Sequence, residues 1–321
     1  MKSLNNKTIL ITGGTGSFGI EAINFLLKKT KLKKLIIFSR DENKQYLLES
    51  KIKDKRLRFF LGDIRDEERL IMAFRDVDYV IHAAAQKHVP SSEYNPFESI
   101  KTNVFGAQAI ISAAIKTKIK KVISLSTDKA CNPINLYGAT KLCSEKLFIN
   151  ANQLSGKNGT KFSVVRYGNV IASRGSVIPF FKELSKDPKN KIPLTDWNMT
   201  RFFISLSDAV FFVLNCLIKM RGYEIFVPKM SSVYIKDIIK ILCPKNKVKI
   251  KGIRQGEKVH ESLFSGEETQ NIYENKKNYL ILPSNLKFNL DKAYKKIKSF
   301  TYSSNLKTNL DYKIVKKLIS Q

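Results

Sequence analysis

Two short segments near the middle of the chain contain side chains that could transfer protons. Ser126 and Thr127 end an apolar run, and Tyr137 and Lys141 follow shortly after. If residues 137–141 are helical, the tyrosine and the lysine lie on one face of the helix. A lysine ammonium beside a phenol stabilises the phenolate, so we expect a lowered Tyr137 pKa and a phenolate that takes a proton from a substrate hydroxyl.

A glycine-rich turn near the N-terminus predicts a dinucleotide site. An apolar run over 8–12 leads into Gly13-Gly14-Thr15-Gly16-Ser17-Phe18-Gly19, and a helical stretch follows. Gly13 would permit the tight turn, Gly16 would let the backbone approach a pyrophosphate, and Gly19 would let the helix pack closely on the strand. The helix N-terminus would offer unpaired N–H groups to the phosphates. The predicted phosphate-binding residues are Gly13, Thr15, Gly16, Ser17, Phe18 and Gly19.

The end of the second predicted strand favours NADP over NAD. Ser39 and Arg40 offer a hydroxyl and a guanidinium, which suit a 2′-phosphate. Asp41 and Glu42 leave NAD open, because a carboxylate at this place accepts the ribose 2′-hydroxyl. A helix N-cap and a first-turn acid would also explain these two residues. We place Ser39, Arg40, Asp41 and Lys44 in the cofactor site.

These residues must be positioned by an alternation of strands and helices. Strands are predicted over 8–12, 34–38, 57–60, 78–82, 121–125 and 161–167, with amphipathic stretches between them. This pattern indicates an α/β fold: a Rossmann-type doubly wound parallel sheet, with a smaller C-terminal substrate-binding region. We expect residues 1–170 to form the Rossmann domain and 206–228 to return to it. Residues 171–205 and 229–283 would bind substrate, and 284–321 would form a Lys-rich tail.

Composition excludes several other classes of protein. The net charge is +29, but only 11 of the 57 basic residues are Arg and the lysines are scattered, so we expect no nucleic-acid partner. Four separated cysteines and three histidines give no metal-ligand spacing, so no metal is expected. The longest apolar stretch, 202–220, carries Asp208 and is typical of a packed helix. We expect no signal peptide, no membrane partner and a cytoplasmic location.

The residues around the proton-transfer set resemble those of the inverting UDP-N-acetylglucosamine 4,6-dehydratases, of the extended short-chain dehydrogenase/reductase superfamily. Retaining dehydratases of that superfamily carry Asp-Glu where this chain has Asp128-Lys129. The resemblance runs from about Lys7 to Pro283 and departs at Gln255, where the family usually has Pro, and at Ala172, where Gly is common. The motifs that carry it are 85–90, 132–141, 166–170, 195–196, 199–202 and 254–258.

The resemblance implies a reaction and a role for each catalytic residue. Tyr137 would take the proton of the sugar 4-hydroxyl as hydride passes from C4 to NADP. Lys129, neutral because burial near Lys141 and the cationic nicotinamide lower its pKa, would take the C5 proton, and protonated Asp128 would release the 6-hydroxyl as water. The hydride would return to C6, so a tightly bound cofactor is recycled. The predicted catalytic residues are Thr127, Asp128, Lys129, Tyr137 and Lys141.

The resemblance also implies the remaining contacts and the assembly. The product would be UDP-2-acetamido-2,6-dideoxy-β-L-arabino-hex-4-ulose, and the protein would form a homo-oligomer. Further cofactor contacts would come from Asp63, Ile64, Ala83, Ala84, Ala85, Lys87, Ser126, Tyr137, Lys141 and Asn169. Contacts with the UDP-sugar would come from Lys87, Asn169, Val177, Thr195, Arg254 and Glu257.

Two other kinds of function, and another role for Arg254, stay open at this point. A UDP-sugar 4-epimerase or C5-epimerase could use the same scaffold but needs no acid followed by lysine at 128–129. A dinucleotide-sensing regulator would not need the Tyr137 and Lys141 pair. Arg254 could form a solvated ion pair with Glu257 instead of binding phosphate.

Overall fold

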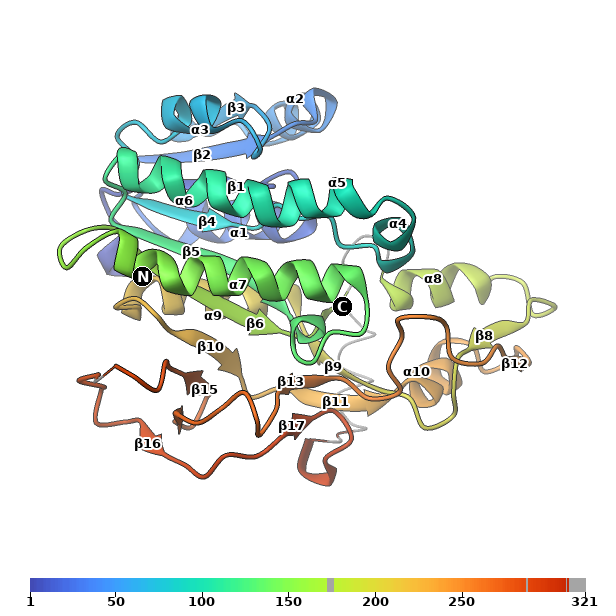
Figure 1. The fold of residues 1–321 in the computed structure, drawn as a ribbon. Helices are drawn as coiled ribbons and strands as arrows, with labels where there is room; N and C mark the ends of the chain where they lie inside the picture. The colour runs from blue at the N-terminus through green and yellow to red at the C-terminus, as the bar shows by residue number, and fades with distance from the viewer. Residues whose placement is uncertain (172–175, 287, 310, 312–321) are drawn as a thin grey trace.

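A ten-stranded sheet forms the centre of the protein. The computed structural model describes residues 1–171, 176–286, 288–309 and 311. The strand order is β16-β14-β15-β10-β6-β5-β4-β1-β2-β3 (Figure 1). The parallel part consists of β1 (Thr8–Thr12), β2 (Lys34–Ser39), β3 (Leu57–Leu61), β4 (Tyr79–His82), β5 (Lys121–Thr127), β6 (Lys161–Tyr167) and β10 (Ile225–Pro228). The predicted α/β fold with a large parallel sheet is therefore confirmed.

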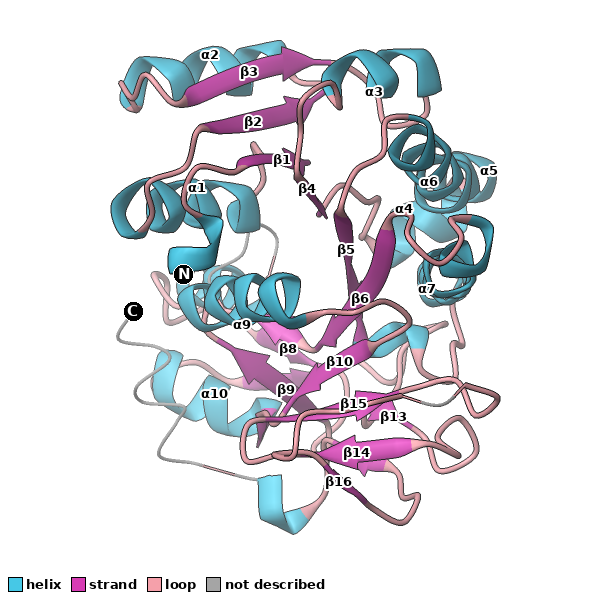
Figure 2. Ribbon diagram, turned by 90° about the vertical axis from the view of Figure 1, so that its left-hand side faces the viewer, coloured by secondary structure: helices cyan, strands magenta, loops and turns pink. Residues whose placement is uncertain are grey.

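Helices cover both faces of the parallel strands. Figure 2 shows α1 (Ser17–Lys29) and α9 (Leu206–Lys219) on one face, and α3 (Glu67–Ala73), α6 (Gly106–Lys116) and α7 (Leu136–Leu154) on the other. All five residues of β1 are buried, because a parallel strand is enclosed on both faces. The remaining helical elements before β5 are η1 (Lys2–Leu4), α2 (Glu42–Lys51), α4 (Val89–Tyr94), α5 (Pro96–Ile100) and η2 (Lys101–Phe105).

Polar side chains start several of these helices. Asp41 caps α2, Asp66 caps α3, Asn135 caps α7 and Ser205 caps α9, each accepting a hydrogen bond from a backbone amide in the first turn. Such caps fix where a helix begins. The Asn135 cap places Tyr137 in the first turn of α7, next to the end of β5.

A second region with its own apolar cluster lies beyond the carboxyl ends of the strands. Ile178, Phe181, Ile192, Ile238 and Ile239 are buried together there. The elements are β7 (Asn169–Val170), α8 (Val177–Leu184), β8 (Ile192–Leu194), β9 (Thr200–Ile204), β11 (Ser231–Tyr234), α10 (Ile235–Leu242) and β12 (Val248–Ile250). The strands pair as β11-β9-β7 and β12-β8.

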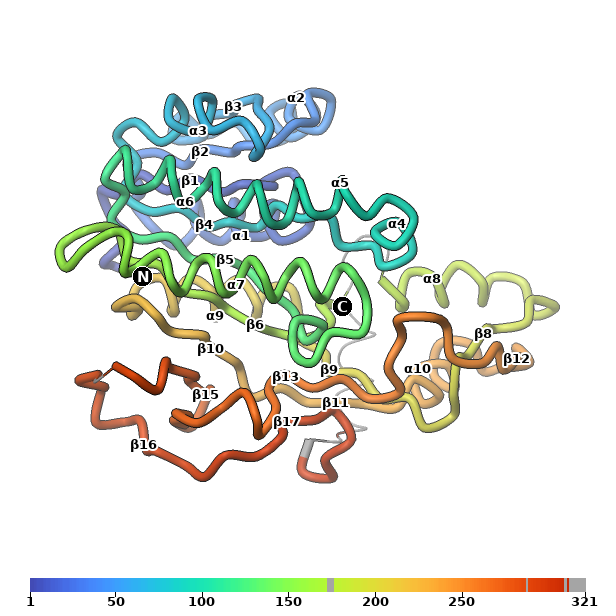
Figure 3. Tube along the Cα trace, in the orientation of Figure 1, coloured from blue at the N-terminus to red at the C-terminus, as the bar shows by residue number. Residues whose placement is uncertain are grey.

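Residues 288–309 pack along the lower edge of the sheet in the tube of Figure 3. There β16 (Lys295–Lys296) pairs with β14 (Ile272–Glu274), which pairs with β15 (Asn278–Ile281). In addition, β17 (Tyr302–Ser303) pairs with β13 (Ser262–Phe264), and η4 (Lys307–Asn309) follows. Tyr302 is buried, and its ring lies 5.0 Å from those of Phe202 and Tyr279. Aromatic packing therefore fixes this segment to the body of the protein.

Candidate active site

A cavity of about 1750 Å³ lies at the carboxyl ends of β1, β2, β4, β5 and β6. Ligands of doubly wound sheets bind at this edge. Gly19, Asp63 and Asp128 are not part of the lining. The predicted residues that line it are Gly13, Thr15, Gly16, Ser17, Phe18, Ser39, Arg40, Asp41, Lys44, Ile64, Ala83, Ala84, Ala85, Lys87, Ser126, Thr127, Lys129, Tyr137, Lys141, Asn169, Val177, Thr195, Arg254 and Glu257. Ala172, where the sequence departs from the family pattern, lies outside the described residues.

The glycine turn has the close contacts that its sequence predicts. Gly13 has a φ of +65°, and a Cβ atom added there would lie 2.8 Å from the Cα atom of Ala84. A Cβ atom on Gly19 would lie 2.2 Å from the carbonyl oxygen of Gly14, so α1 packs closely on the turn. The first residue of α1, Ser17, lines the cavity. The turn therefore leaves room for a ligand beside the amides of a helix N-terminus.

Charged residues at the end of β2 pair with one another. Arg40 Nη1 lies 3.4 Å from Asp63 Oδ2, and Asp63 also accepts hydrogen bonds from Arg65. Burial acts to raise the pKa of Asp63, but the hydrogen bonds from Arg65 outweigh it and the net pKa is lowered. Asp41 caps α2, accepting from the Lys44 amide at 2.9 Å. The Arg40 side chain remains 59% exposed, so its guanidinium is accessible from the cavity.

Tyr137 and Lys141 both line the cavity from α7. The sequence suggested that Lys141 would shift the pKa of Tyr137, but Lys141 is not among the groups that do so. Lys141 is buried, and its Nζ donates to the carbonyl oxygen of Leu125 at 2.7 Å. Burial lowers the pKa of Lys141 to about 8, although Glu145 acts in the opposite direction.

Burial raises the pKa of Tyr137 to about 12. Asp128 acts in the same direction, whereas the positive charge of Lys129 and a hydrogen bond with Thr127 act to lower it. The prediction that Lys141 lowers the pKa of this phenol is therefore wrong for this structure. The cation that favours the phenolate is Lys129, which comes from the loop after β5.

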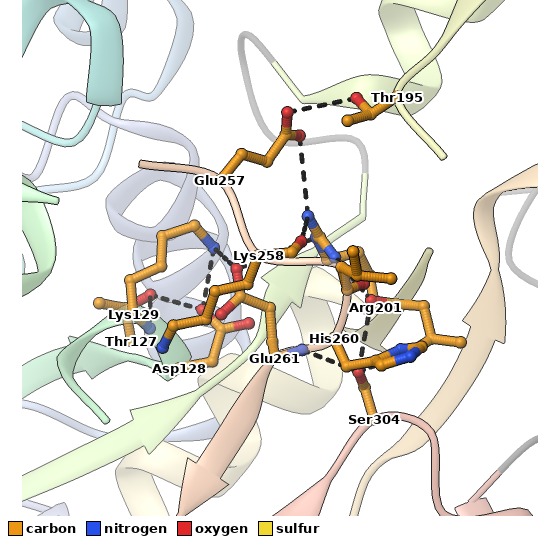
Figure 4. Close-up of polar contacts among 12 residues, drawn as sticks. Thr127, Asp128, Lys129, Thr195, Arg201, Glu257, Lys258, His260, Glu261 and Ser304 are labelled. Carbon is orange, nitrogen blue, oxygen red and sulfur yellow. Dashed lines mark hydrogen bonds and ion pairs between the residues drawn. The ribbon is translucent and has the colours of Figure 1, made fainter. Parts of the chain in front are cut away.

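Lys129 lies between two buried carboxylates, as Figure 4 shows. Its Nζ is 3.0 Å from Asp128 Oδ1 and 3.5 Å from Glu261 Oε1. Burial acts to lower the pKa of Lys129, but the charges of Asp128 and Glu261 outweigh it and the net pKa is raised. Lys129 is therefore held as an ammonium in this structure by a second carboxylate that sequence spacing did not reveal. A neutral Lys129 beside a cationic nicotinamide stays a prediction.

Asp128 is fully buried behind the residues that line the cavity. Its Oδ1 accepts hydrogen bonds from Thr127 Oγ1 at 2.9 Å and from Lys129. Its Oδ2 is buried without a hydrogen-bond partner among the described residues. Thr127 lines the cavity, so its hydroxyl connects Asp128 to the space where a ligand would lie.

The far wall of the cavity carries a second polar cluster. Thr195 donates to Glu257 Oε2 at 3.2 Å, and Arg254 Nε lies 3.9 Å from the same oxygen. Because Arg254 is 63% exposed, this ion pair is a solvated one, and the guanidinium stays accessible. Asn135 Nδ2 donates to the carbonyl oxygen of Gly256 at 2.7 Å, which holds this loop against the start of α7.

Two buried charged residues of the cavity lining were not among the predicted site residues. Arg201 and Glu261 both line the cavity, and both are buried. Arg201 lies in a motif that carried the family resemblance, which was a usable signal. Glu261 had none, because it meets Lys129 only through the folding together of segments that lie far apart in the chain.

Within the described ranges, no cluster of His, Cys, Asp and Glu could hold a metal ion. None of the helices in those ranges is long and apolar enough to cross a membrane.

The doubly wound sheet, the glycine turn after β1 and the Tyr137 and Lys141 pair define an enzyme of the extended short-chain dehydrogenase/reductase class. The chain belongs to the polysaccharide biosynthesis protein family, whose family model matches residues 9–283.

Two of the similar proteins have the names of enzymes that act on nucleotide sugars. The chain is 55% identical over 280 residues to the inverting UDP-N-acetylglucosamine 4,6-dehydratase of Campylobacter jejuni, which covers 87% of this chain and 84% of that protein. It is 45% identical over 270 residues to the UDP-glucose 4-epimerase of Rickettsia akari, covering 82% and 79%. The crystal structure of Pen from Bacillus thuringiensis matches with a TM-score of 0.91 and 36% identity, over 99% of this chain and 98% of that one.

Proposed function

We propose that the protein is an inverting 4,6-dehydratase that converts UDP-N-acetylglucosamine to UDP-2-acetamido-2,6-dideoxy-β-L-arabino-hex-4-ulose. The observation that carries the proposal is that Lys129 and Tyr137 line one cavity and that Asp128 lies buried directly beside Lys129. A 4-epimerase needs no acid–lysine pair. The similarity to the Campylobacter jejuni dehydratases supports the same activity, and it exceeds the similarity to the Rickettsia epimerases.

The glycine turn and the end of β2 fit NADP. Gly13 has the positive φ of a tight turn, and Gly16 and Ser17 line the cavity where a pyrophosphate would lie beside the start of α1. Asp41 is engaged in capping α2, whereas the exposed guanidinium of Arg40 can pair with a 2′-phosphate. NAD remains the alternative, since Asp41 also lines the cavity. The nicotinamide ring, when bound, accepts a hydride from C4 of the sugar and returns it to C6.

Side chains of the protein carry out the proton transfers of the proposed reaction. Tyr137 takes the proton of the 4-hydroxyl, and Lys129 takes the C5 proton, which the new 4-keto group makes acidic. Asp128 acts in its carboxylic acid form, and because it does not line the cavity, its proton passes through the Thr127 hydroxyl, which then gives its own proton to the leaving 6-hydroxyl. Protonation of C5 from the opposite face then inverts the sugar. Lys141 hydrogen-bonds the nicotinamide ribose.

The UDP group is held by the far wall of the cavity. Arg254 pairs with the phosphates, because a guanidinium makes two parallel hydrogen bonds to phosphate oxygens. Thr195, Glu257, Lys87, Asn169 and Val177 line the same space and would contact the nucleotide sugar. The product would enter a surface glycan through a deoxyamino sugar such as pseudaminic acid. The homo-oligomeric assembly and the cytoplasmic location stay predictions.

The test is incubation with UDP-N-acetylglucosamine in heavy water without added reductant. A product that has lost one water and carries deuterium at C5 is expected. An unchanged mass together with formation of the 4-epimer would refute the dehydratase and support the epimerase.

A further inference from the structure

Glu261 is a buried acid directly beside the proposed base. Its side chain is 4% exposed, and it lines the cavity. Its Oε1 lies 3.5 Å from Lys129 Nζ and 4.0 Å from Arg201 Nε. Its Oε2 is buried and has no hydrogen-bond partner in the part of the chain that the structure describes. A buried carboxylate with an unsatisfied oxygen costs free energy, and such groups are concentrated at functional sites.

The ion pairs of Lys129 pose a problem for its role as a base. An ammonium group has no lone pair, so Lys129 must lose a proton before it can take one from C5. Asp128 and Glu261 both stabilise the ammonium form. Some nearby group must therefore accept that proton when the substrate is bound.

We propose that Glu261 takes the proton of the Lys129 ammonium and so produces the amine that acts on C5. The proposal rests on the proposed dehydration. In this transfer an N–H bond of Lys129 breaks and an O–H bond of Glu261 forms, so an ion pair becomes an amine and a carboxylic acid. The amine then takes the C5 proton, and the electrons of the C5–H bond form the C5–C6 double bond. The C6–O bond breaks, and its oxygen leaves as water with a proton that Asp128 takes up from solvent when the substrate binds, so that Asp128 is an anion in the free protein and a carboxylic acid at this step.

Glu261 is protonated more readily than an acid on the protein surface, because of the groups that surround it. Burial raises its pKa, and the charge of Asp128 acts in the same direction, whereas Lys129, Arg201 and Lys258 act to lower it. A bound sugar would exclude water from the cavity. Exclusion of water raises the cost of keeping an ion pair relative to two neutral groups. Glu261 therefore acts through Lys129 as a positioning residue that sets its protonation state.

The backbone around Glu261 is fixed by the C-terminal segment. The Glu261 amide donates to Ser304 Oγ at 3.0 Å, and the Ser304 amide donates to the Glu261 carbonyl oxygen at 2.8 Å. Ser304 Oγ also lies 2.7 Å from Thr200 Oγ1. This backbone pairing restricts where the carboxylate can lie, which proton transfer over a short distance requires.

The test compares the pH dependence of dehydration in Glu261→Gln and in the wild type. With glutamine at 261, the Lys129 ammonium must lose its proton to water. We expect dehydration to be about 100-fold slower at pH 7 and to rise about tenfold for each pH unit up to pH 9. The wild type should be nearly flat over the same range. Glu261→Asp keeps a carboxylate and should return a flat profile, even at a reduced rate.

A matched control removes a comparable charge away from the cavity. Glu274 on β14 pairs with Lys229 at the surface, so Glu274→Gln should keep the wild-type rate and profile. Unchanged NADP binding would show that the Glu261 variants are folded.

The outcomes separate the two proposals. Suppose that the wild type dehydrates UDP-N-acetylglucosamine and that Glu261→Gln keeps a flat pH profile, whether its dehydration is fast or slow. The role of Glu261 is then overturned. If the wild type gives no dehydrated product, the proposed function is wrong and this inference falls with it.

Discussion

Ser304 accepts a hydrogen bond from the Glu261 amide at 3.0 Å across a sequence separation of 43 residues. This contact joins the C-terminal segment to the wall of the cavity. Its consequence is that a residue far from the dinucleotide fold helps to position a charged group beside Lys129.

Ser304→Ala should lower both stability and turnover. The substitution leaves the buried Glu261 amide and the Thr200 hydroxyl without this partner, which costs about 1–3 kcal/mol of unfolding free energy. Urea unfolding and the dehydration rate provide the measurement. Ser50→Ala, which removes a hydroxyl on the surface of α2, should change neither. Wild-type stability in Ser304→Ala would contradict the assigned role.

Tyr137→Phe should abolish turnover while dinucleotide binding is kept. The substitution removes the phenol oxygen that takes the 4-hydroxyl proton but retains the ring. Single-turnover absorbance of the reduced nicotinamide would report oxidation at C4, and fluorescence titration would report binding. Measurable dehydration in this variant would refute the role of Tyr137.

Lys129→Ala should stop elimination after C4 has been oxidised. Without the ammonium, Asp128 and Glu261 are two buried acids that no longer share a cation. Their repulsion should also make the variant less stable as pH rises. Reduced nicotinamide without loss of water is the expected result. Dehydration at the wild-type rate would place the base elsewhere.

Arg40→Ala should weaken NADP and leave NAD almost unchanged. Loss of a charge-assisted contact with a 2′-phosphate corresponds to about a 10- to 100-fold weaker NADP affinity. Calorimetric titration with both cofactors measures this ratio. The control is Arg58→Ala. Arg58 lies on β3, and its guanidinium donates to the carbonyl oxygens of Lys55 and Leu57. An equal loss for both cofactors would argue against a 2′-phosphate contact.

Lys141 should make stability depend on pH in the alkaline range. Its folded-state pKa is about 8, below the value near 10.4 of an unfolded chain. Between these values the unfolded state binds more protons, so unfolding free energy rises with pH. Relative to Lys141→Met, the wild type should gain up to about 3 kcal/mol between pH 7.5 and 10.5. Urea unfolding at several pH values measures it, and a difference that falls with pH would contradict the buried amine.

The sequence was most informative where a local pattern decides the structure. The predicted strands over 8–12 and 161–167 coincide with β1 and β6. The prediction succeeded because enclosed parallel strands are continuous apolar runs. The role of Gly19 could be predicted for a similar reason, since its close contact with Gly14 lies within one strand–turn–helix unit.

Protonation states were decided only by the tertiary structure. The sequence by itself determined that Asp128, Lys129, Tyr137 and Lys141 come after one strand of a dinucleotide fold. It did not determine that Glu261 lies beside Lys129, or that Lys141 donates to the Leu125 carbonyl oxygen rather than supporting the phenol. A pKa depends on burial and on every nearby charge. For Lys129 one of those charges is Glu261, which lies 132 positions further along the chain (261 minus 129). Spacing along the chain contains no information on such contacts.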